Sequence, residues 1–470
     1  MSINFKISID RDEKRLEELY QSYETDGLDA IRSNHEVIKF LTYHYMPHTP
    51  WTTSNTQKIS TRLLCQVFPH ISEEEHAPQY DLQIMLLETI RSSFRDLSPN
   101  PQKAVGGLRP QLGYSNDYYD SRQKWKQTPS KLHVISTLYF YLSKFSVSEA
   151  ELRQDWNLYS SCVLKVLDDT DAVIKSLGCH ILGLIIGKLR GNDVEFGRFN
   201  YFTQSGLDKV LLESISIGLS YLPTLSKIED SRMILPISYS SSAAIIVKCS
   251  KTVKEQDERL LQFLNDEIIN KVGLIMNLPQ NEKITILQIY IRAAEEIINL
   301  LHRSRKVVLV LRKLLWSFVL NILTDGFLFL GIGANESGND DLVNTEVFVE
   351  EVLKFLETLM EMAKERVNKY RYDIFTTMIL FLERYEQEVN GDVHEDVSQF
   401  RKLVEMKDEQ EKSLAEKQEK IVLKNSNIQA SAEKILAIAV DSYEDKRQAQ
   451  LEVSEIIDRK PFMSNYFLII

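Results

Sequence analysis

Two amphipathic segments joined by a very short acidic turn constrain the fold of this chain more than any other feature. The first segment starts at Trp156 and the second ends at Leu189, and both place apolar residues at three- and four-residue intervals. Between them lies Asp168-Asp169-Thr170-Asp171, a run of the short polar side chains that cap helix starts. The pattern predicts a helical hairpin in which these aspartates cap the second helix, an interpretation we favour over a metal-binding trio.

The order of residues after the turn resembles one HEAT repeat. Ile174-Lys175 is followed by the small pair Gly178-Cys179 and then by Ile181-Leu182. Further helix candidates form pairs with a spacing near 40 residues per pair, namely 131–145 with 152–167, 171–190 with 206–222, and 230–250 with 256–277. We predict an all-α fold, a HEAT-like α-solenoid built as a superhelix of antiparallel helical hairpins. Such a fold is a binding surface rather than a catalyst.

Glycine and proline usage supports this fold and divides the chain. With 17 Gly and 12 Pro in 470 residues, the chain lacks the turns that an all-β fold would need. Most prolines fall before residue 131, which predicts short helices there and long helices afterwards. The predicted divisions are an N-terminal helical region (1–97), a long loop (98–130), the solenoid (131–390), and a charged connector with a C-terminal helix over about 428–458 (391–470).

Charge, cysteine content and hydropathy exclude several classes of protein. The net charge of −11 argues against a nucleic-acid partner, because an acidic chain repels phosphates. Four dispersed cysteines predict free thiols in a reducing compartment. The apolar stretch Leu314–Ala334 has the length of a membrane span, but Asn321 and Asp325-Gly326 interrupt it. We therefore predict two short buried helices that meet at Asp325-Gly326, and no membrane partner.

Candidate catalytic or cofactor-binding chemistry is sparse. His44, His48, Cys65 and His70 form the only cluster with metal-ligand character, but prolines interrupt the helix that would align the histidines. No nucleophile elbow or phosphate-binding loop occurs. We predict no catalytic, metal-binding or cofactor-binding residues, and a metal-dependent hydrolase that uses this cluster is the alternative.

Two further features concern helix ends and charge. Ser205-Gly-Leu-Asp208 predicts a capping box for a helix over Leu207–Leu222. One basic cluster is either a binding site for an acidic partner segment or a set of helix-end charges. Its members are Arg303, Arg305, Lys306, Arg312 and Lys313.

Residues Trp156 to Leu323 resemble the family of the smallest subunit of the triple-T (TTT) co-chaperone complex. Three phrases carry the resemblance in order: the hairpin, SGLDKVLLESISIGLSYLP at 205–223, and MILPISYSS at 233–241, where Pro236 is expected to interrupt a helix. Ser205 stands where the family usually has Thr. The matching residues are Trp156, Asp168, Asp169, Ile174, Lys175, Gly178, Gly206, Leu207, Asp208, Leu211, Leu212 and Pro236.

This resemblance implies a non-enzymatic scaffold or adaptor subunit in the cytoplasm and nucleus. Its implied partners are two larger helical co-chaperone subunits, a heat-shock chaperone system, and client phosphoinositide-kinase-related kinases. The implied processes are kinase folding, assembly and stability, with consequences for TOR signalling, the DNA damage response and telomere maintenance. A solenoid adaptor of transport or coat type is a further alternative.

Overall fold

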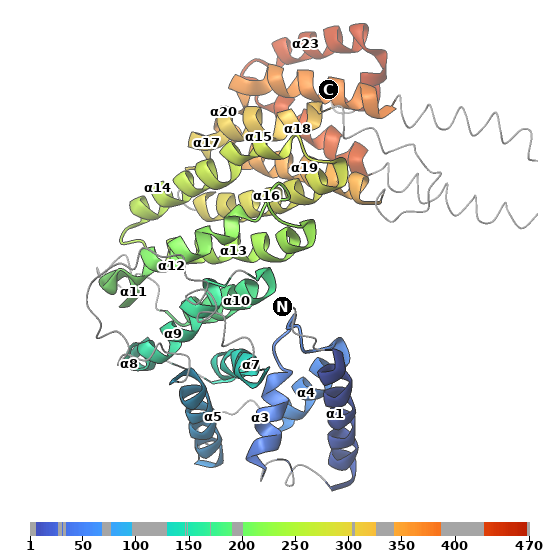
Figure 1. Ribbon diagram of the computed structural model, residues 1–470. Coiled ribbons are helices and arrows are strands. Elements are labelled where there is room, and N and C mark those ends of the chain that lie inside the picture. The colour runs from blue at the N-terminus through green and yellow to red at the C-terminus, as the bar shows by residue number, and fades with distance from the viewer. Residues whose placement is uncertain are drawn as a thin grey trace, which may run out of the picture. The chain divides into compact units, whose positions relative to one another are not determined.

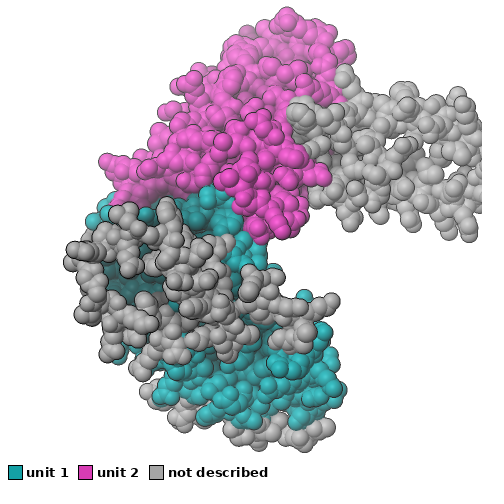
Figure 2. All heavy atoms as spheres, in the orientation of Figure 1, with its two compact units in different colours: residues 1–221, 233–252 teal, residues 222–232, 253–470 magenta. Residues whose placement is uncertain are grey.

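Every regular element in the described part of the chain is a helix. The computed structural model describes residues 6–26, 31, 34–67, 77–95, 129–145, 147, 149–169, 171–189, 201–302, 306–325, 343–386 and 427–467, and these contain no strand (Figure 1). The predicted all-α solenoid is therefore confirmed. The chain divides into two compact units (Figure 2): unit 1 comprises 1–221 and 233–252, and unit 2 comprises 222–232 and 253–470.

Unit 1 is built from two layers of helices. Its elements are α1 (Lys6–Asp26), α3 (His35–Tyr43), α4 (Ser54–Val67), α5 (Ala77–Arg95), α7 (Pro129–Lys144), α8 (Glu149–Gln154), α9 (Trp156–Leu167), α10 (Ala172–Lys188), α11 (Tyr201–Ser205), α12 (Leu207–Ser216), η3 (Gly218–Ser220) and, from Met233 onward, α13 (Ile228–Cys249). Helices α3, α7 and α10 pack in succession, as do α5, α9 and α12. The pairs α5–α7 and α9–α10 connect the two layers.

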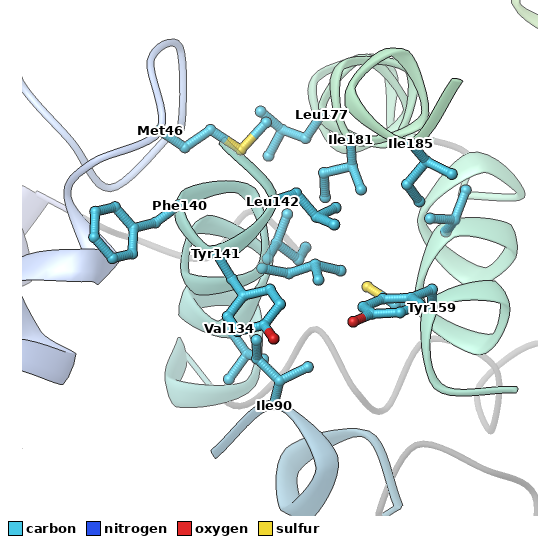
Figure 3. Close-up of a cluster of buried hydrophobic side chains, with 14 of the residues drawn as sticks. Met46, Ile90, Val134, Phe140, Tyr141, Leu142, Tyr159, Leu177, Ile181 and Ile185 are labelled. Atoms are coloured by element: carbon cyan, nitrogen blue, oxygen red, sulfur yellow. The ribbon is translucent and has the colours of Figure 1, made fainter. Parts of the chain in front are cut away.

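The core of unit 1 lies between these layers. Figure 3 shows Tyr141 and Leu142 of α7 on the side of the helix that faces Tyr159 of α9 and Ile181 of α10. These side chains are buried because each hairpin carries an apolar stripe that it cannot cover by itself. Polar contacts also join α5 to the next helices, since Arg91 Nη2 lies 2.8 Å from Asp155 Oδ1 and Gln83 Nε2 donates to the Tyr141 hydroxyl at 3.3 Å.

Unit 2 repeats the same arrangement with longer helices. Its elements are α14 (Val253–Phe263), η4 (Leu264–Ile268), η5 (Ile269–Lys271), α15 (Val272–Ile275), α16 (Gln280–His302), α17 (Val307–Leu314), η6 (Leu315–Val319), α18 (Leu320–Thr324), α19 (Val343–Met362), α20 (Lys364–Val367), η8 (Asn368–Tyr370), helical residues 371–386 and 427–441, α23 (Lys446–Arg459) and η9 (Pro461–Asn465). Elements η4 and η6 are single π-helical turns within longer helices.

Side-chain contacts join each helix of unit 2 to its counterpart in the next repeat. In one layer the contacts are Lys313 Nζ to Asn265 Oδ1 (2.5 Å), Arg384 Nη1 to Thr324 O (3.0 Å) and Tyr372 Oη to Glu452 Oε1 (3.0 Å). In the other layer they are Arg292 Nη2 to Glu351 Oε1 (2.6 Å) and Lys434 Nζ to Glu357 Oε1. Equivalent helices therefore stack side by side, as a solenoid requires.

The predicted pairing of helices in unit 1 is wrong by one helix. Helix α9 packs most extensively on α10 and far less on α7, while α12 packs more on α9 than on α10. The reason is the length of the connections. The turn at 168–171 is so short that the helices before and after it must pack as an antiparallel pair. A repeat spacing of 40 residues does not specify the pairing, because it is the same whether each helix pairs with the one before it or with the one after it.

Two predicted helix boundaries also differ from the structure. Helix α13 continues through Pro236, so the expected interruption is wrong. Pro236 is exposed, and the Arg232 carbonyl that loses its donor lies on the side of the helix that water can reach. The single helix expected over 428–458 is two helices, because the chain turns at 442–445 and Asp445 caps α23 by accepting from Arg447 N at 2.9 Å.

The first half of the apolar stretch that suggested a membrane span belongs to one helix, which covers Val307–Thr324. By length and a mean hydropathy of 1.8 it could cross a membrane, but 56% of it is buried inside the unit, as in the core helix of a soluble protein. The helix ends beside Asp325, whose carboxylate lies 3.3 Å from the buried Lys283 Nζ. The second predicted helix, after Gly326, lies outside the described residues.

Replacement of Ile174 by Asp tests the hairpin packing. Ile174 is only 5% exposed, so the new carboxylate would be buried without a partner. We expect the free energy of unfolding to fall by about 3–5 kcal/mol, measured by urea denaturation. Gly183→Asp on the exposed face of α10 is the matched control and should change stability by less than about 0.5 kcal/mol. Equal stability of the two variants would contradict the packing.

Candidate functional site

The acidic turn of the α9–α10 hairpin is a capping structure. Asp171 is the N-cap of α10, and its Oδ1 accepts hydrogen bonds from Val173 N at 3.0 Å and Ile174 N at 3.4 Å. Asp169 Oδ1 accepts from Asp171 N at 2.7 Å and so tightens the turn. Asp168 is the C-cap residue of α9. The predicted capping role is confirmed for Asp171, and the carboxylates also complement the positive end of the α10 dipole.

Lys175 closes the other side of this turn. Its side chain is buried, and its ammonium group donates to the backbone carbonyl of Leu167, an acceptor at the end of α9. Burial lowers the pKa of Lys175, and the nearby Asp168 and Asp169 carboxylates partly offset that effect. Of the two adjacent motif residues, Ile174 thus packs in the core and Lys175 caps the C-terminal end of α9.

Gly178 sets the distance between the two helices of the hairpin. A Cβ atom at this position would lie 3.1 Å from the backbone N and Cδ2 of Leu167 and 3.1 Å from Cγ1 of Val166. The small residue therefore permits α10 to approach the backbone of α9 closely. Its neighbour Cys179 is fully buried and lies 4.0 Å from the Ser238 hydroxyl, and burial raises the pKa of its thiol to about 11.

The second family phrase packs against the first. Trp156 at the start of α9 lies edge-on to Phe202, with 4.8 Å between ring centroids. Leu211 and Asp208 of α12 are buried, whereas Leu207 and Leu212 are partly buried against the same core. The apolar motif residues of these two phrases therefore pack in one core, whereas Asp208 lies in the first turn of α12, where it complements the helix dipole.

The predicted capping box at Ser205 is wrong. Ser205 is the last residue of α11, and its hydroxyl donates back to the carbonyls of Tyr201 at 2.7 Å and Phe202 at 3.3 Å. The N-cap of α12 is Gly206, at φ 74°, with no side-chain cap. A left-handed residue is needed at this junction, and only glycine adopts that conformation without strain.

The four metal-ligand candidates are not brought together in the described structure. The His44 ring lies 3.9 Å from Asp12, His48 stacks on His180, and Cys65 Sγ accepts from Lys144 Nζ at 3.3 Å. His70 lies outside the described residues. No group of three His, Cys, Asp or Glu side chains within the described residues could hold a metal ion. All four cysteines are free thiols, and Cys162, Cys179 and Cys249 are buried whereas Cys65 is exposed.

A buried pair of histidines was not found by sequence reasoning. His44 and His133 are buried with 6.3 Å between ring centroids, and the Nε2 atoms of both lack hydrogen-bond partners. Burial lowers the pKa of each to about 4, although the Asp12 carboxylate acts in the opposite direction. The two residues are 89 positions apart in the sequence, so no local spacing could have revealed the pair.

Only part of the predicted basic cluster can be placed. Arg303 and Arg305 lie outside the described residues, and Lys306 is the half-buried N-cap residue of α17. Arg312 and Lys313 are exposed on α17. The same helix run carries Trp316, which lies in the stretch predicted to form a short buried helix but is itself 53% exposed. Its spacing of seven residues from Leu309 could have indicated a shared outer face.

Comparison with known proteins identifies one family. A family model described as the Tti2 family matches residues 37–329, which is more than half of the chain. No curated protein and no solved structure matches the sequence. The matched region contains all three phrases that carry the resemblance, from the α9–α10 hairpin to Pro236.

Alanine replacements at two glycines of α10 test the close approach of α9 and α10. Gly183→Ala fills open space and should raise the free energy of unfolding by about 0.5–1 kcal/mol, since alanine is the better helix former. Gly178→Ala places a methyl group against the Leu167 backbone and should lower it by about 1–3 kcal/mol. Chemical denaturation measures both. Similar stabilisation by the two replacements would show that the contact at Gly178 does not limit how closely α9 and α10 approach.

The buried histidines predict a loss of stability in mild acid. Because their pKa values are about 4 in the folded chain and near 6.5 when unfolded, the unfolded state binds more protons between these values. Their contribution is complete above pH 6.5 and is lost as the pH falls toward 4, on the order of a few kcal/mol. Denaturation from pH 7.5 to 4.5 should show this slope, and His44→Gln combined with His133→Gln should reduce it. His35→Gln at an exposed histidine is the control, and an unchanged slope in the double variant would refute the assignment.

Proposed function

This chain belongs to the Tti2 family of TTT-complex subunits, and from that membership we propose that it is a non-enzymatic scaffold supporting the folding, assembly and stability of phosphoinositide-kinase-related kinases. The family match over residues 37–329 is the observation that carries the proposal. In this role the chain binds two larger helical co-chaperone subunits and acts with a heat-shock chaperone system in cytoplasm and nucleus. Its clients are kinases of the TOR and DNA-damage classes, which connects it to telomere maintenance.

The physical properties of the described residues support a scaffolding role. Stacked hairpins in each unit expose helix faces to solvent, and interfaces between obligate partners commonly bury more than about 2,000 Å² in total. The histidines at 44 and 133 are neutral and enclosed at physiological pH, so they are not poised as general bases near pH 7.

Affinity isolation from native lysate followed by quantitative mass spectrometry tests the proposal. The tagged chain should recover two large helical subunits in stoichiometric amounts, with client kinases and chaperones in smaller amounts. Ile174→Asp should reduce this recovery, whereas Gly183→Asp should not, since only the first replacement disturbs the hairpin core.

A second arm measures the clients directly. Depletion of the chain should lower the steady-state abundance of the kinases, and expression of the wild-type sequence should restore it. A chain that is recovered alone as a monomer, with kinase levels unchanged by its depletion, would refute the proposed function.

A further inference from the structure

The helix run Val307–Thr324 has a buried inner face and an exposed outer face. Its inner residues include Leu311, Leu314 and Phe318, all with no exposed surface. On the outer side Leu309 is 60% exposed and Trp316 is 53% exposed. Seven residues separate these two side chains, which is about two helical turns, so both lie on the same side of the helix.

This outer face has the composition of a binding site. Tryptophan is a highly buried residue on average, and it is enriched together with arginine at the energetic centres of protein interfaces. Arg312 and Lys313 lie between Leu309 and Trp316 in the sequence, and both are exposed. We call the set Leu309, Arg312, Lys313 and Trp316 the Trp316 face.

The charge of the Trp316 face is opposite to that of the chain. The chain carries a net charge of −11, yet this face presents two cations. Arg312 makes no hydrogen bond or ion pair with the described residues, whereas Lys313 Nζ donates to Asn265 Oδ1 at 2.5 Å. A partner with carboxylates at matching positions would therefore gain charge-assisted hydrogen bonds, mainly from Arg312.

The neighbouring helices extend this surface. Lys313 contacts the preceding helix at Asn265, and Arg384 Nη1 donates to the Thr324 carbonyl at 3.0 Å from the following one. In Figure 1 the labels α14 and α17 follow one another along one side of unit 2, in agreement with the contact between Lys313 and Asn265. Exposed apolar residues also occur elsewhere in unit 2, at Leu274 of α15 and at Leu380 of the helical residues 371–386. A surface formed by parallel helices provides shallow grooves that suit a helical ligand.

Trp316 belongs to a π-helical turn. Element η6 comprises Leu315–Val319, and its i→i+5 hydrogen bonding inserts one extra residue into the helix. Such turns occur often at functional sites. Here Leu315 and Phe318 stay buried on either side of Trp316 in the sequence, while Trp316 itself points outward.

We propose that the Trp316 face binds an acidic amphipathic helix from a partner subunit. The apolar stripe of that helix covers Leu309 and Trp316, and its Asp or Glu side chains pair with Arg312 and Lys313. The inference rests on the proposed function, which supplies the partner subunits, and it adds the surface and the chemistry of recognition. A membrane surface is less favoured, because basic segments that bind anionic lipids carry clusters of about four to eight Lys or Arg, whereas this face carries two cations.

Three variants test the proposal with purified partner subunits. Trp316→Ala should weaken binding by at least about tenfold, as removal of an interface tryptophan commonly does. Arg312→Glu combined with Lys313→Glu should weaken it further and reduce its salt dependence, since the charge attraction is lost. Leu225→Ala, at an exposed apolar residue outside the face, should leave affinity unchanged.

Folding and occupancy need separate controls. Thermal melting of each variant should match the wild type, because the replaced side chains are largely exposed. A photo-crosslinking residue at position 309 should crosslink to a partner subunit in the intact complex, and the same residue at position 225 should not. Crosslinks confined to this chain would mean that one of its own segments covers the face, and they would overturn the proposal.

The outcomes separate the two levels of inference. If the wild-type chain binds the partner subunits and all variants bind equally well, the Trp316 face is not the docking surface but the proposed function stands. If the wild-type chain binds no partner subunit, the proposed function itself fails. Cosedimentation with phosphatidylserine-containing vesicles that is lost in Trp316→Ala, without any effect on partner binding, would assign the face to a lipid surface instead and overturn the proposal.

Discussion

The rest of the structure depends on how closely neighbouring helices approach, because no hairpin of this kind can cover its own apolar stripe. In the α9–α10 hairpin the approach is set at Gly178, where any side chain would meet the backbone of Leu167. Lys175 then reaches the Leu167 carbonyl from the adjoining turn of α10. Burying this ammonium group carries a desolvation cost, visible in the lowered pKa, and the cost is offset because the end of α9 gains a charged donor for a carbonyl that would otherwise lack one. Gly178 and Lys175 therefore both stabilise the contact between α10 and the end of α9 at Leu167.

Much of the fold could be predicted from residue periodicity. The 3.6-residue repeat and the scarcity of proline after residue 130 are sufficient to locate the long helices α16 and α19, and the acidic turn identifies one hairpin. The order in which helices pair could not be predicted, because a repeat spacing is unchanged when every pair shifts by one helix.

Two predictions from local sequence patterns, a helix break at Pro236 and a helix cap at Ser205, were wrong because the outcome depends on the surrounding structure. Pro236 is tolerated within α13 because its side of the helix is solvated, and Ser205 does not cap α12 because it still belongs to α11.

In the candidate site, too, some residues could be predicted from the sequence and others could not. The apolar residues of the family motif were found because they pack in the core, and packing leaves a periodic signal in the sequence. Trp316 lies within an apolar run that resembles a buried helix, so its exposure has no such periodic signal. In a two-layer solenoid each helix is covered by the opposite layer and by the helices before and after it, so only a narrow stripe remains exposed. Which residues form that stripe depends on the rotation of the helix, and a π-helical turn such as η6 changes this rotation without any mark in the sequence.

The positions of several residue types in the described part of the chain agree with the proposed scaffolding role. In an enzyme, titratable side chains open into a cleft and their pKa values lie near the working pH. Here the arrangement is reversed, since His44 and His133 are enclosed with pKa values near 4 and act as neutral aromatic packing groups. The exposed positions instead hold Trp316 and Arg312, which contribute large contact area and charge-assisted hydrogen bonds at interfaces. Because the buried inner stripe supplies most of the apolar packing of the stack, residues on the outer face can contribute to partner binding without loss of the fold.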